Sequence, residues 1–272
     1  MANALQERYS KLLDAKLRQT IVTKDNLIFN NKHEGDAKAG VVKIPVRATE
    51  TAVNDYNKAT GLDAVEGTTT YLTLALNKDK AVNELIDGFD AVAVPDNIVA
   101  DRIDSASYSL ALQIDKDSIA CLESQGTKAS DKVASTDSTV YKNILKARTT
   151  LSKNGVPNEN RFLIASPETM ELIMQDSKYI KQGDLSQELV ANGVVGKIGG
   201  FNVFESCNLG ATTEFICGHS DYCHRVTEWQ VPVHVQDLSG SGKYIGASAV
   251  QGRKVYGVVV SNAKAVYIKA NA

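Results

Sequence analysis

Two cysteines and two histidines in the last third of the sequence have residue types that can bind a metal ion. They are Cys217, His219, Cys223 and His224, with Cys207 ten residues before the first of them. Zinc in proteins takes thiolate and imidazole ligands of this kind. The spacing is not that of a standard zinc knuckle, and the adjacent Cys223 and His224 would point to opposite faces of a strand. We therefore interpret these residues as ordinary strand cysteines and surface histidines, and we assign no metal site. Cys217, His219, Cys223 and His224 remain the alternative candidates for metal ligands.

Patterns typical of catalysis are also weak. The sequence contains no G-x-S-x-G motif. Cys121 falls on an apolar helical stripe, which indicates packing rather than a nucleophile. Two pairs of carboxylates have the spacing of helix ends or solvated helix faces: Glu168 with Glu171, and Asp115 with Asp117. We expect no enzymatic activity and no cofactor.

The composition is that of an ordinary globular protein. The chain has 272 residues, a net charge of −2, 43% hydrophobic residues and 23% charged residues. A dedicated DNA-binding protein would usually be strongly basic. The sequence has no apolar run of about 18 residues, so no membrane span is expected, and residues 1–20 do not have the apolar core of a signal peptide. Four widely spread cysteines indicate free thiols in a reducing cytoplasm.

The first forty residues predict a helix followed by a loop. Apolar residues recur at three- and four-residue spacing between residues 5 and 21, which predicts an amphipathic helix of four to five turns. Residues 30–40 are polar and predict a loop.

Two alternating segments predict a long hairpin. Residues 41–48 and 68–76 each alternate apolar and polar side chains, and Pro45 favours an edge position for the first. Residues 49–67 between them are polar. A ribbon with so little apolar matter at its tip is marginal alone, so we expect it to lie on another surface. Residues 78–80 and a turn at 87–90 are expected to close it.

Two helices are predicted next. Asp96 can cap a helix that runs to about residue 123, roughly 40 Å at about 1.5 Å per residue, and Gly126 ends it. Residues 127–138 are polar and small and predict a linker. A second helix is expected over residues 139–153, with its lysines and Arg148 facing outward.

Residues 157–209 predict a strand, a short helix, a glycine-punctuated loop and a second strand. The strand covers 161–165, and the second strand covers 201–207. Between them, Ser166 caps a helix over 168–175, with Pro167 at the first helical position. The glycines do not have the spacing of a dinucleotide fingerprint. Further strands are expected over 213–218, 222–226, 231–236, 256–260 and 265–269. A helix is expected over residues 246–255, although Gly246 and Gly252 disfavour helical structure.

This central stretch resembles a known family. The step R-F-L-I-A-S-P, followed after a gap by G-V-V-G-K-I-G-G-F-N-V-F-E-S, resembles the major capsid proteins of tailed bacteriophages, which have the Hong Kong 97-type fold and include the encapsulin shells as relatives. The order of the hairpin, the long helix and the central sheet agrees with that family. The resemblance implies an α+β fold with an N-terminal arm, an extended loop, a peripheral domain with a spine helix, and an axial domain.

The resemblance also implies a division of the chain. The arm would cover residues 1–40, the extended loop 41–89, the peripheral domain 90–137 and about 219–243, and the axial domain 138–218 and about 244–272.

A structural function follows from the resemblance. It implies a shell of pentamers and hexamers around double-stranded DNA that is bound without sequence specificity, with portal and scaffolding proteins as partners and no membrane. Location in the virion after assembly in the host bacterial cytoplasm is implied as well. Two alternatives are an encapsulin-like compartment and a soluble zinc-binding protein.

Overall fold

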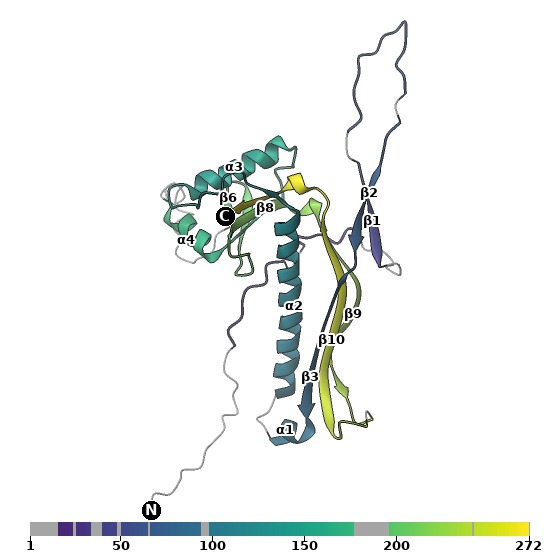
Figure 1. Cartoon of the computed structure of the whole chain (residues 1–272), viewed down its shortest axis with the longest axis vertical. Coiled ribbons are helices and arrows are strands. Elements are labelled where there is room, and N and C mark those ends of the chain that lie inside the picture. The colour runs from purple at the N-terminus through teal and green to yellow at the C-terminus, as the bar shows by residue number, and fades with distance from the viewer. Residues whose placement is uncertain are drawn as a thin grey trace, which may run out of the picture.

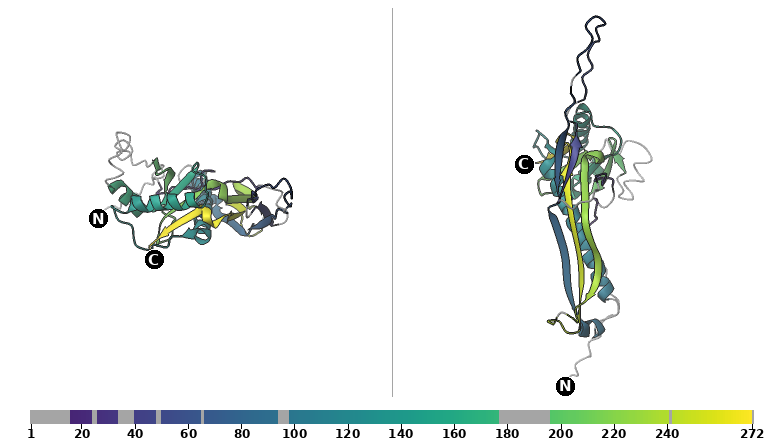
Figure 2. Two further views of the ribbon diagram at one scale, coloured as in Figure 1. Left: turned by 90° about the horizontal axis from the view of Figure 1, so that it is seen from above. Right: turned by 90° about the vertical axis from the view of Figure 1, so that its right-hand side faces the viewer.

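The computed structural model describes residues 16–23, 26–33, 40–47, 50–64, 66–93, 98–176, 196–240 and 242–271. The molecule is elongated, with a compact domain at one side, a long helix beside a narrow sheet, and a ribbon that projects beyond both (Figures 1 and 2). Helices and strands both contribute, as the α+β prediction requires. Within the described residues, no helix is both long and apolar enough to cross a bilayer.

The projecting ribbon is the predicted hairpin. Strands β1 (Val41–Val46) and β2 (Thr70–Ala75) pair antiparallel, with Ile44 opposite Leu72. Their apolar face is buried at the base of the ribbon against Val226 and Val259. In the described part of the chain β1 pairs only with β2, so it is an edge strand and tolerates Pro45.

A three-stranded sheet lies along the long helix. Its order is β3 (Lys78–Asp87), β10 (Ala247–Val260), β9 (Cys223–Asp237), and all pairs are antiparallel. Helix α2 (Ile98–Gln125) packs against one face through Ala106 and neighbouring apolar residues. The predicted spine helix is confirmed in position and length, although its expected cap, Asp96, lies outside the described residues.

Three predictions for this sheet were wrong. The helix predicted over residues 246–255 is part of strand β10, which begins at Ala247. The two strands predicted between 222 and 236 are one strand, and residues 78–87, part of which was expected to close the hairpin, form strand β3. The short helix α1 (Gly88–Ala93) stands where a turn was expected. Gly252 accounts for part of the error, because a side chain there would lie 2.7 Å from Val233 Cγ2. Glycine at this position is explained by close strand packing, which local sequence cannot reveal.

The compact domain contains a six-stranded mixed sheet. Its order is β4 (Thr127–Lys128), β11 (Val266–Ala270), β8 (Thr213–His219), β5 (Arg161–Ala165), β7 (Phe201–Glu205), β6 (Lys197–Ile198). Helices α3 (Val140–Lys153) and α4 (Pro167–Gln175) cover one face. The end of α2 covers the other face together with Val22, Ile28 and Phe29. Two short 3₁₀ turns join the two sheets: η1 (Ser220–Tyr222) connects β8 to β9, and η2 (Ala263–Ala265) connects β10 to β11.

Local chemistry explains the strand-to-helix step at residue 166. The Ser166 hydroxyl accepts a hydrogen bond from the Thr169 amide at 3.2 Å, and Pro167 occupies the first helical position, as predicted. Arg161 at the start of β5 is 2% exposed and donates to the carbonyls of Pro157 and Val156 at 2.7 and 2.6 Å. This buried cation ties the chain that follows α3 to the sheet.

The N-terminal helix prediction is wrong over its last part. Residues 16–21 are not helical, and residues 1–15 lie outside the described residues. Arg18 pairs with Asp104, and the Gln19 amide donates to the Tyr108 hydroxyl at 2.7 Å. This segment makes contacts with α2 in place of the internal hydrogen bonds of a helix. It therefore lies along the surface of α2 without regular secondary structure.

Candidate assembly surfaces

The cysteines and histidines singled out in the sequence are divided between two cores. Cys217 is buried beneath α3 and α4, whereas Cys223 is buried on the opposite face of the sheet. Burial raises the pKa of both thiols. Cys207, ten residues before Cys217, is exposed. No group of three histidine, cysteine or carboxylate side chains suited to a metal ion occurs among the described residues.

His224 and His219 take structural positions instead. His224 lies 4% exposed, with Nδ1 2.8 Å from the Asn30 Oδ1, and His33 contacts its ring edge-on. Burial is the main cause that lowers the pKa of His224 to about 4, with a further contribution from His33. His219 Nδ1 accepts a hydrogen bond from the Asp221 amide at 3.1 Å, and burial lowers its pKa as well. The sequence had suggested surface histidines, so burial of these two corrects that expectation.

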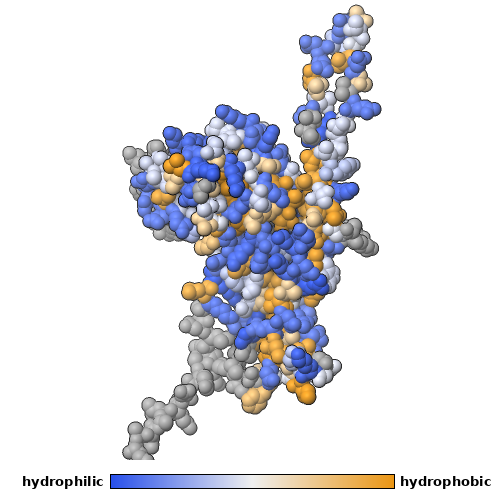
Figure 3. Space-filling view, viewed as in Figure 1, coloured by the Kyte–Doolittle hydropathy of each residue, from blue (hydrophilic) through white to orange (hydrophobic). Residues whose placement is uncertain are grey.

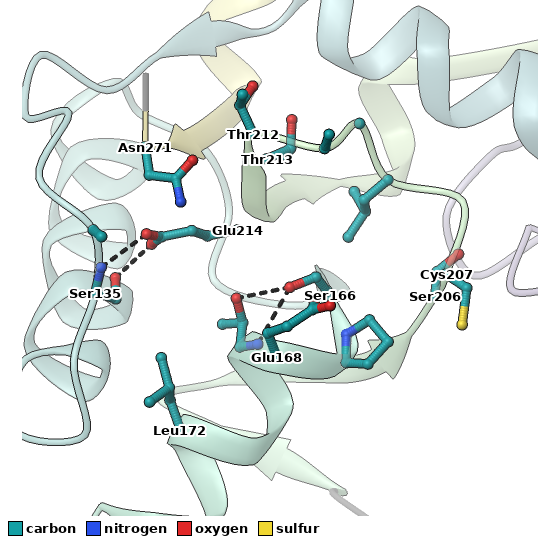
Figure 4. A pocket seen from close by; sticks show the side chains of 16 residues that line it. Ser135, Ser166, Glu168, Leu172, Ser206, Cys207, Thr212, Thr213, Glu214 and Asn271 are labelled. Carbon is teal, nitrogen blue, oxygen red and sulfur yellow. Dashed lines mark hydrogen bonds between the residues drawn. The ribbon is translucent and has the colours of Figure 1, made fainter.

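A cavity of about 440 Å³ lies between α4 and the ends of β5, β7 and β8 (Figure 4). Several of its polar side chains hold the fold together. Glu214 accepts hydrogen bonds from the Ser135 amide at 2.8 Å and from the Ser135 hydroxyl at 2.5 Å, which holds the α2–α3 connection to the sheet. Ser166 caps α4. Glu214, Ser135 and Ser166 therefore have structural roles in the wall of the cavity.

The arm is anchored through a carboxylate that the sequence analysis did not single out for this role. Asp115 on α2 is fully buried, and its Oδ1 accepts from the Val22 and Thr23 amides at 3.1 and 2.8 Å. The Asn208 side chain donates to its other oxygen at 2.7 Å. A charged residue beside Ile114 on the apolar stripe was the available signal, because buried carboxylates require several donors. Phe29, further along the same segment, is fully buried and packs in the core beneath the sheet.

The ribbon tip makes a different kind of surface. All the described residues from 50 to 64 are exposed, and Val53 and Tyr56 are 97% and 72% exposed. The tip is held by local contacts: the Gly61 amide donates to the Asn57 carbonyl at 2.8 Å, and the Ala59 amide donates to the Asn57 Oδ1 at 2.9 Å. Apolar side chains that meet only water contribute nothing to stability, so they are available to another surface.

Other exposed apolar residues gather where the narrow sheet ends. Phe89 is 78% exposed and Ile245 is 92% exposed. The space-filling view shows apolar side chains at this lower end and beside the base of the ribbon, whereas the surface over α3 is mainly hydrophilic (Figure 3). Exposed apolar side chains at the extremities of an elongated molecule are typical of surfaces that meet other protein chains.

Comparison with known proteins identifies a family. A family model described as phage capsid protein matches residues 86–268, which is more than half of the chain. No curated protein matches the chain.

Solved structures resemble the whole fold. One from Mycobacterium phage Che8 has a TM-score of 0.82 and 24% identity, covering 98% of this chain and 97% of the other. The capsid structure of the cyanophage P-SCSP1u has a TM-score of 0.80 at 12% identity, covering 98% and 93%. The mature capsid of bacteriophage PhiM1 has a TM-score of 0.72 at 13% identity, covering 98% and 92%. The expected Hong Kong 97-type fold is thereby confirmed, and neither the encapsulin-like nor the zinc-binding alternative is favoured.

Proposed function

The chain belongs to the phage capsid protein family, and we propose that its copies form pentamers and hexamers that close into the icosahedral head of a tailed phage. It is a structural protein of the virion, a major capsid protein whose work is assembly. We assign it no enzymatic activity and no metal, because Glu214 and Ser135 in its cavity and His224 in its cysteine–histidine segment are engaged in holding the fold.

The exposed ribbon tip carries the proposal. Its base is buried against the protein's own body, but its tip residues 50–64 are exposed and pack against no other described part of the chain. Ordering such a tip costs conformational entropy that water contact does not offset. A neighbouring copy that covers the tip would supply the missing apolar contact, and each weak contact would be repeated around a closed shell.

We propose the following division of the chain. The arm covers residues 1–40 and the extended loop begins at residue 41. The peripheral part is built on α2 with β9, β10 and β3, and the axial part is the six-stranded sheet with α3 and α4. The boundary at residue 89 expected from sequence is moved to about residue 77, because β3 pairs along its length with β10.

Partners beyond sister copies are also part of the proposal. A closed head needs a portal for DNA entry, and we infer that a scaffolding protein guides assembly in the host bacterial cytoplasm. Packaged double-stranded DNA would be held without sequence specificity. A net charge of −2 agrees with a wall that confines DNA rather than binding it tightly.

Removal of the ribbon tip tests the proposed function. Residues 47–69 are replaced by Asn-Gly, which forms a two-residue turn between the paired residues Val46 and Thr70. We expect the variant to fold, with a thermal midpoint close to that of dissociated wild-type subunits, but to form no closed particles in negative-stain images. Wild-type protein expressed alongside provides the reference. Wild-type subunits that stay monomeric at high concentration, or tipless subunits that close normal shells, would contradict the proposal.

A further inference from the structure

A cationic groove runs beside α3. It has a volume of about 660 Å³ and lies between the helix and the chain segment after α2. Four exposed lysines line it: Lys128, Lys142, Lys146 and Lys153. Helix α3 itself carries four basic residues and no acidic one. The whole chain has a net charge of −2, so the positive charge of the groove is a local feature and not a consequence of a basic composition.

The groove contains little opposite charge of its own. Among the described residues that line it, Asp131 is the one carboxylate, and Lys146 Nζ lies 3.4 Å from its Oδ2. Lys142 and Lys153 form no ion pair with any described residue. Like charges gathered in this way repel one another, so an acidic surface placed against the groove would be stabilised.

The direction of the groove favours a neighbouring copy over DNA. Figure 1 is a view along the shortest axis of the molecule, and α3 lies along the upper rim of the compact domain in that view. One face of this helix packs on the domain, and its four basic residues, Lys142, Lys146, Arg148 and Lys153, are exposed. A flat subunit covers the most shell area when its short axis is normal to the shell. Groups on the rim would then face other subunits rather than the interior.

The same domain has an acidic surface toward another rim. Helix α4 carries Glu168 and Glu171, both exposed, and no basic residue. Figure 1 places α4 at the lower left of the domain, away from the upper rim along which α3 lies. The glutamates are three residues apart, and Lys142 and Lys146 are four apart, so each pair spans about one helical turn. Opposite charges with matched spacing on different rims suit a head-to-tail contact.

We propose that the groove along α3 receives the α4 surface of the next copy, with Lys142 and Lys146 facing Glu168 and Glu171. When each copy makes this head-to-tail contact with the next in the same rotational direction, the copies close into a ring. This inference rests on the proposed function and adds the surfaces that join neighbouring subunits within a ring. A single exposed ion pair contributes little, but complementary charge sets orientation, and ring closure multiplies weak contacts.

Exchange of the charges tests the contact. Lys142→Glu with Lys146→Glu makes the groove acidic, and Glu168→Lys with Glu171→Lys makes α4 basic. We expect each double variant to lose rings and shells in sedimentation and negative-stain images at 0.15 M salt, a concentration at which surface charges still interact over about 8 Å. The variant with all four changes is expected to recover both.

Two further variants serve as controls. Lys116→Glu with Lys243→Glu changes the net charge equally but leaves both surfaces intact, so it should assemble like wild type. Lys142→Gln with Lys146→Gln removes charge with little effect on the helix. It should weaken assembly and reduce its dependence on salt. Circular dichroism of dissociated subunits checks that each variant is folded.

Several outcomes would overturn the proposal. They are double variants that assemble like wild type, a fourfold variant that assembles no better than the doubles, or equal loss in the Lys116 and Lys243 control. Shells that form normally from the groove variant but no longer retain a 30-base-pair DNA duplex would instead assign the groove to nucleic acid. Since wild-type shells would still be present in each case, the proposed function itself would stand.

Discussion

At the scale of single residues, the arm is held to the body by buried polar groups. His224 contacts both Asn30 and His33. Lys32, which pairs with Asp221, lies close by. Protonation of His224 is therefore disfavoured both by burial of the charge and by repulsion from Lys32 and His33. These causes hold the pKa of His224 at about 4, against about 6.5 for an unfolded histidine. The folded protein therefore keeps this ring neutral in a pH range where the unfolded chain protonates it.

A pH dependence of stability follows from His224. Because the unfolded state binds more protons between pH 6.5 and 4, the free energy of unfolding should be highest above pH 6.5 and fall as the pH drops toward 4. The contribution of His224 is at most about 3 kcal/mol, at about 1.4 kcal/mol per pKa unit. Urea midpoints of dissociated subunits between pH 7 and 4.5 measure it, and His224→Gln should flatten the slope.

The matched control is His234→Gln, which changes an exposed histidine on the same strand. It should leave the slope unchanged. Carboxylates such as Asp221, whose pKa is lowered mainly by its hydrogen bond from Lys32, lose their charge below this window and do not imitate the effect. An identical slope in wild type and His224→Gln would show that the ring is not the titrating group.

At the scale of elements, the base of the ribbon depends on one close approach between strands. A Cβ atom at Gly257 of β10 would lie 2.5 Å from the Ala75 carbonyl oxygen and 2.5 Å from Leu74 Cδ2. The Ala75 carbonyl belongs to the backbone, so it cannot move aside as the end of a flexible side chain can. The absence of a side chain at Gly257 therefore lets the ribbon lie on the sheet and bury Leu74.

We expect Gly257→Ala to separate the ribbon from the sheet in part. The free energy of unfolding should fall by about 1–3 kcal/mol, as is typical when a packed site is overfilled. Chemical denaturation measures the change. Gly240→Ala is the matched control, since a Cβ there would meet no described atom within 4 Å. Equal stability of the two variants would show that the ribbon base tolerates displacement.

At the scale of the whole molecule, the exposed ribbon tip should report assembly. Lys58 lies in the exposed tip, and trypsin cleaves after lysine. We expect rapid cleavage after Lys58 in dissociated subunits and cleavage at least roughly ten-fold slower in shells, because a covered segment must open before it is cut. Mass spectrometry of timed digests measures both rates. Dissociating the same shells should restore the fast rate, and equal rates in both states would mean that neighbours leave the tip uncovered.

The local pattern of the sequence was sufficient for several elements. Alternation predicted β1 and β2, three- and four-residue spacing predicted α2 and α3, and Ser166 followed by Pro167 predicted the start of α4. These features are determined by residues close together in the chain, since side-chain periodicity and capping act within a few positions. The order of these elements, with the motif near Gly199, was enough to indicate the capsid fold.

Only the tertiary structure decided which surfaces meet. β10 was not recognised as a strand because Gly252 is explained by contact with β9, and residues 16–21 are not helical because α2 supplies their partners. The two cysteines look like one cluster in the sequence, yet Cys217 and Cys223 lie on opposite sides of a sheet. The groove along α3 likewise combines lysines from separate segments. Such relations depend on contacts between distant parts of the chain, which local periodicity does not encode.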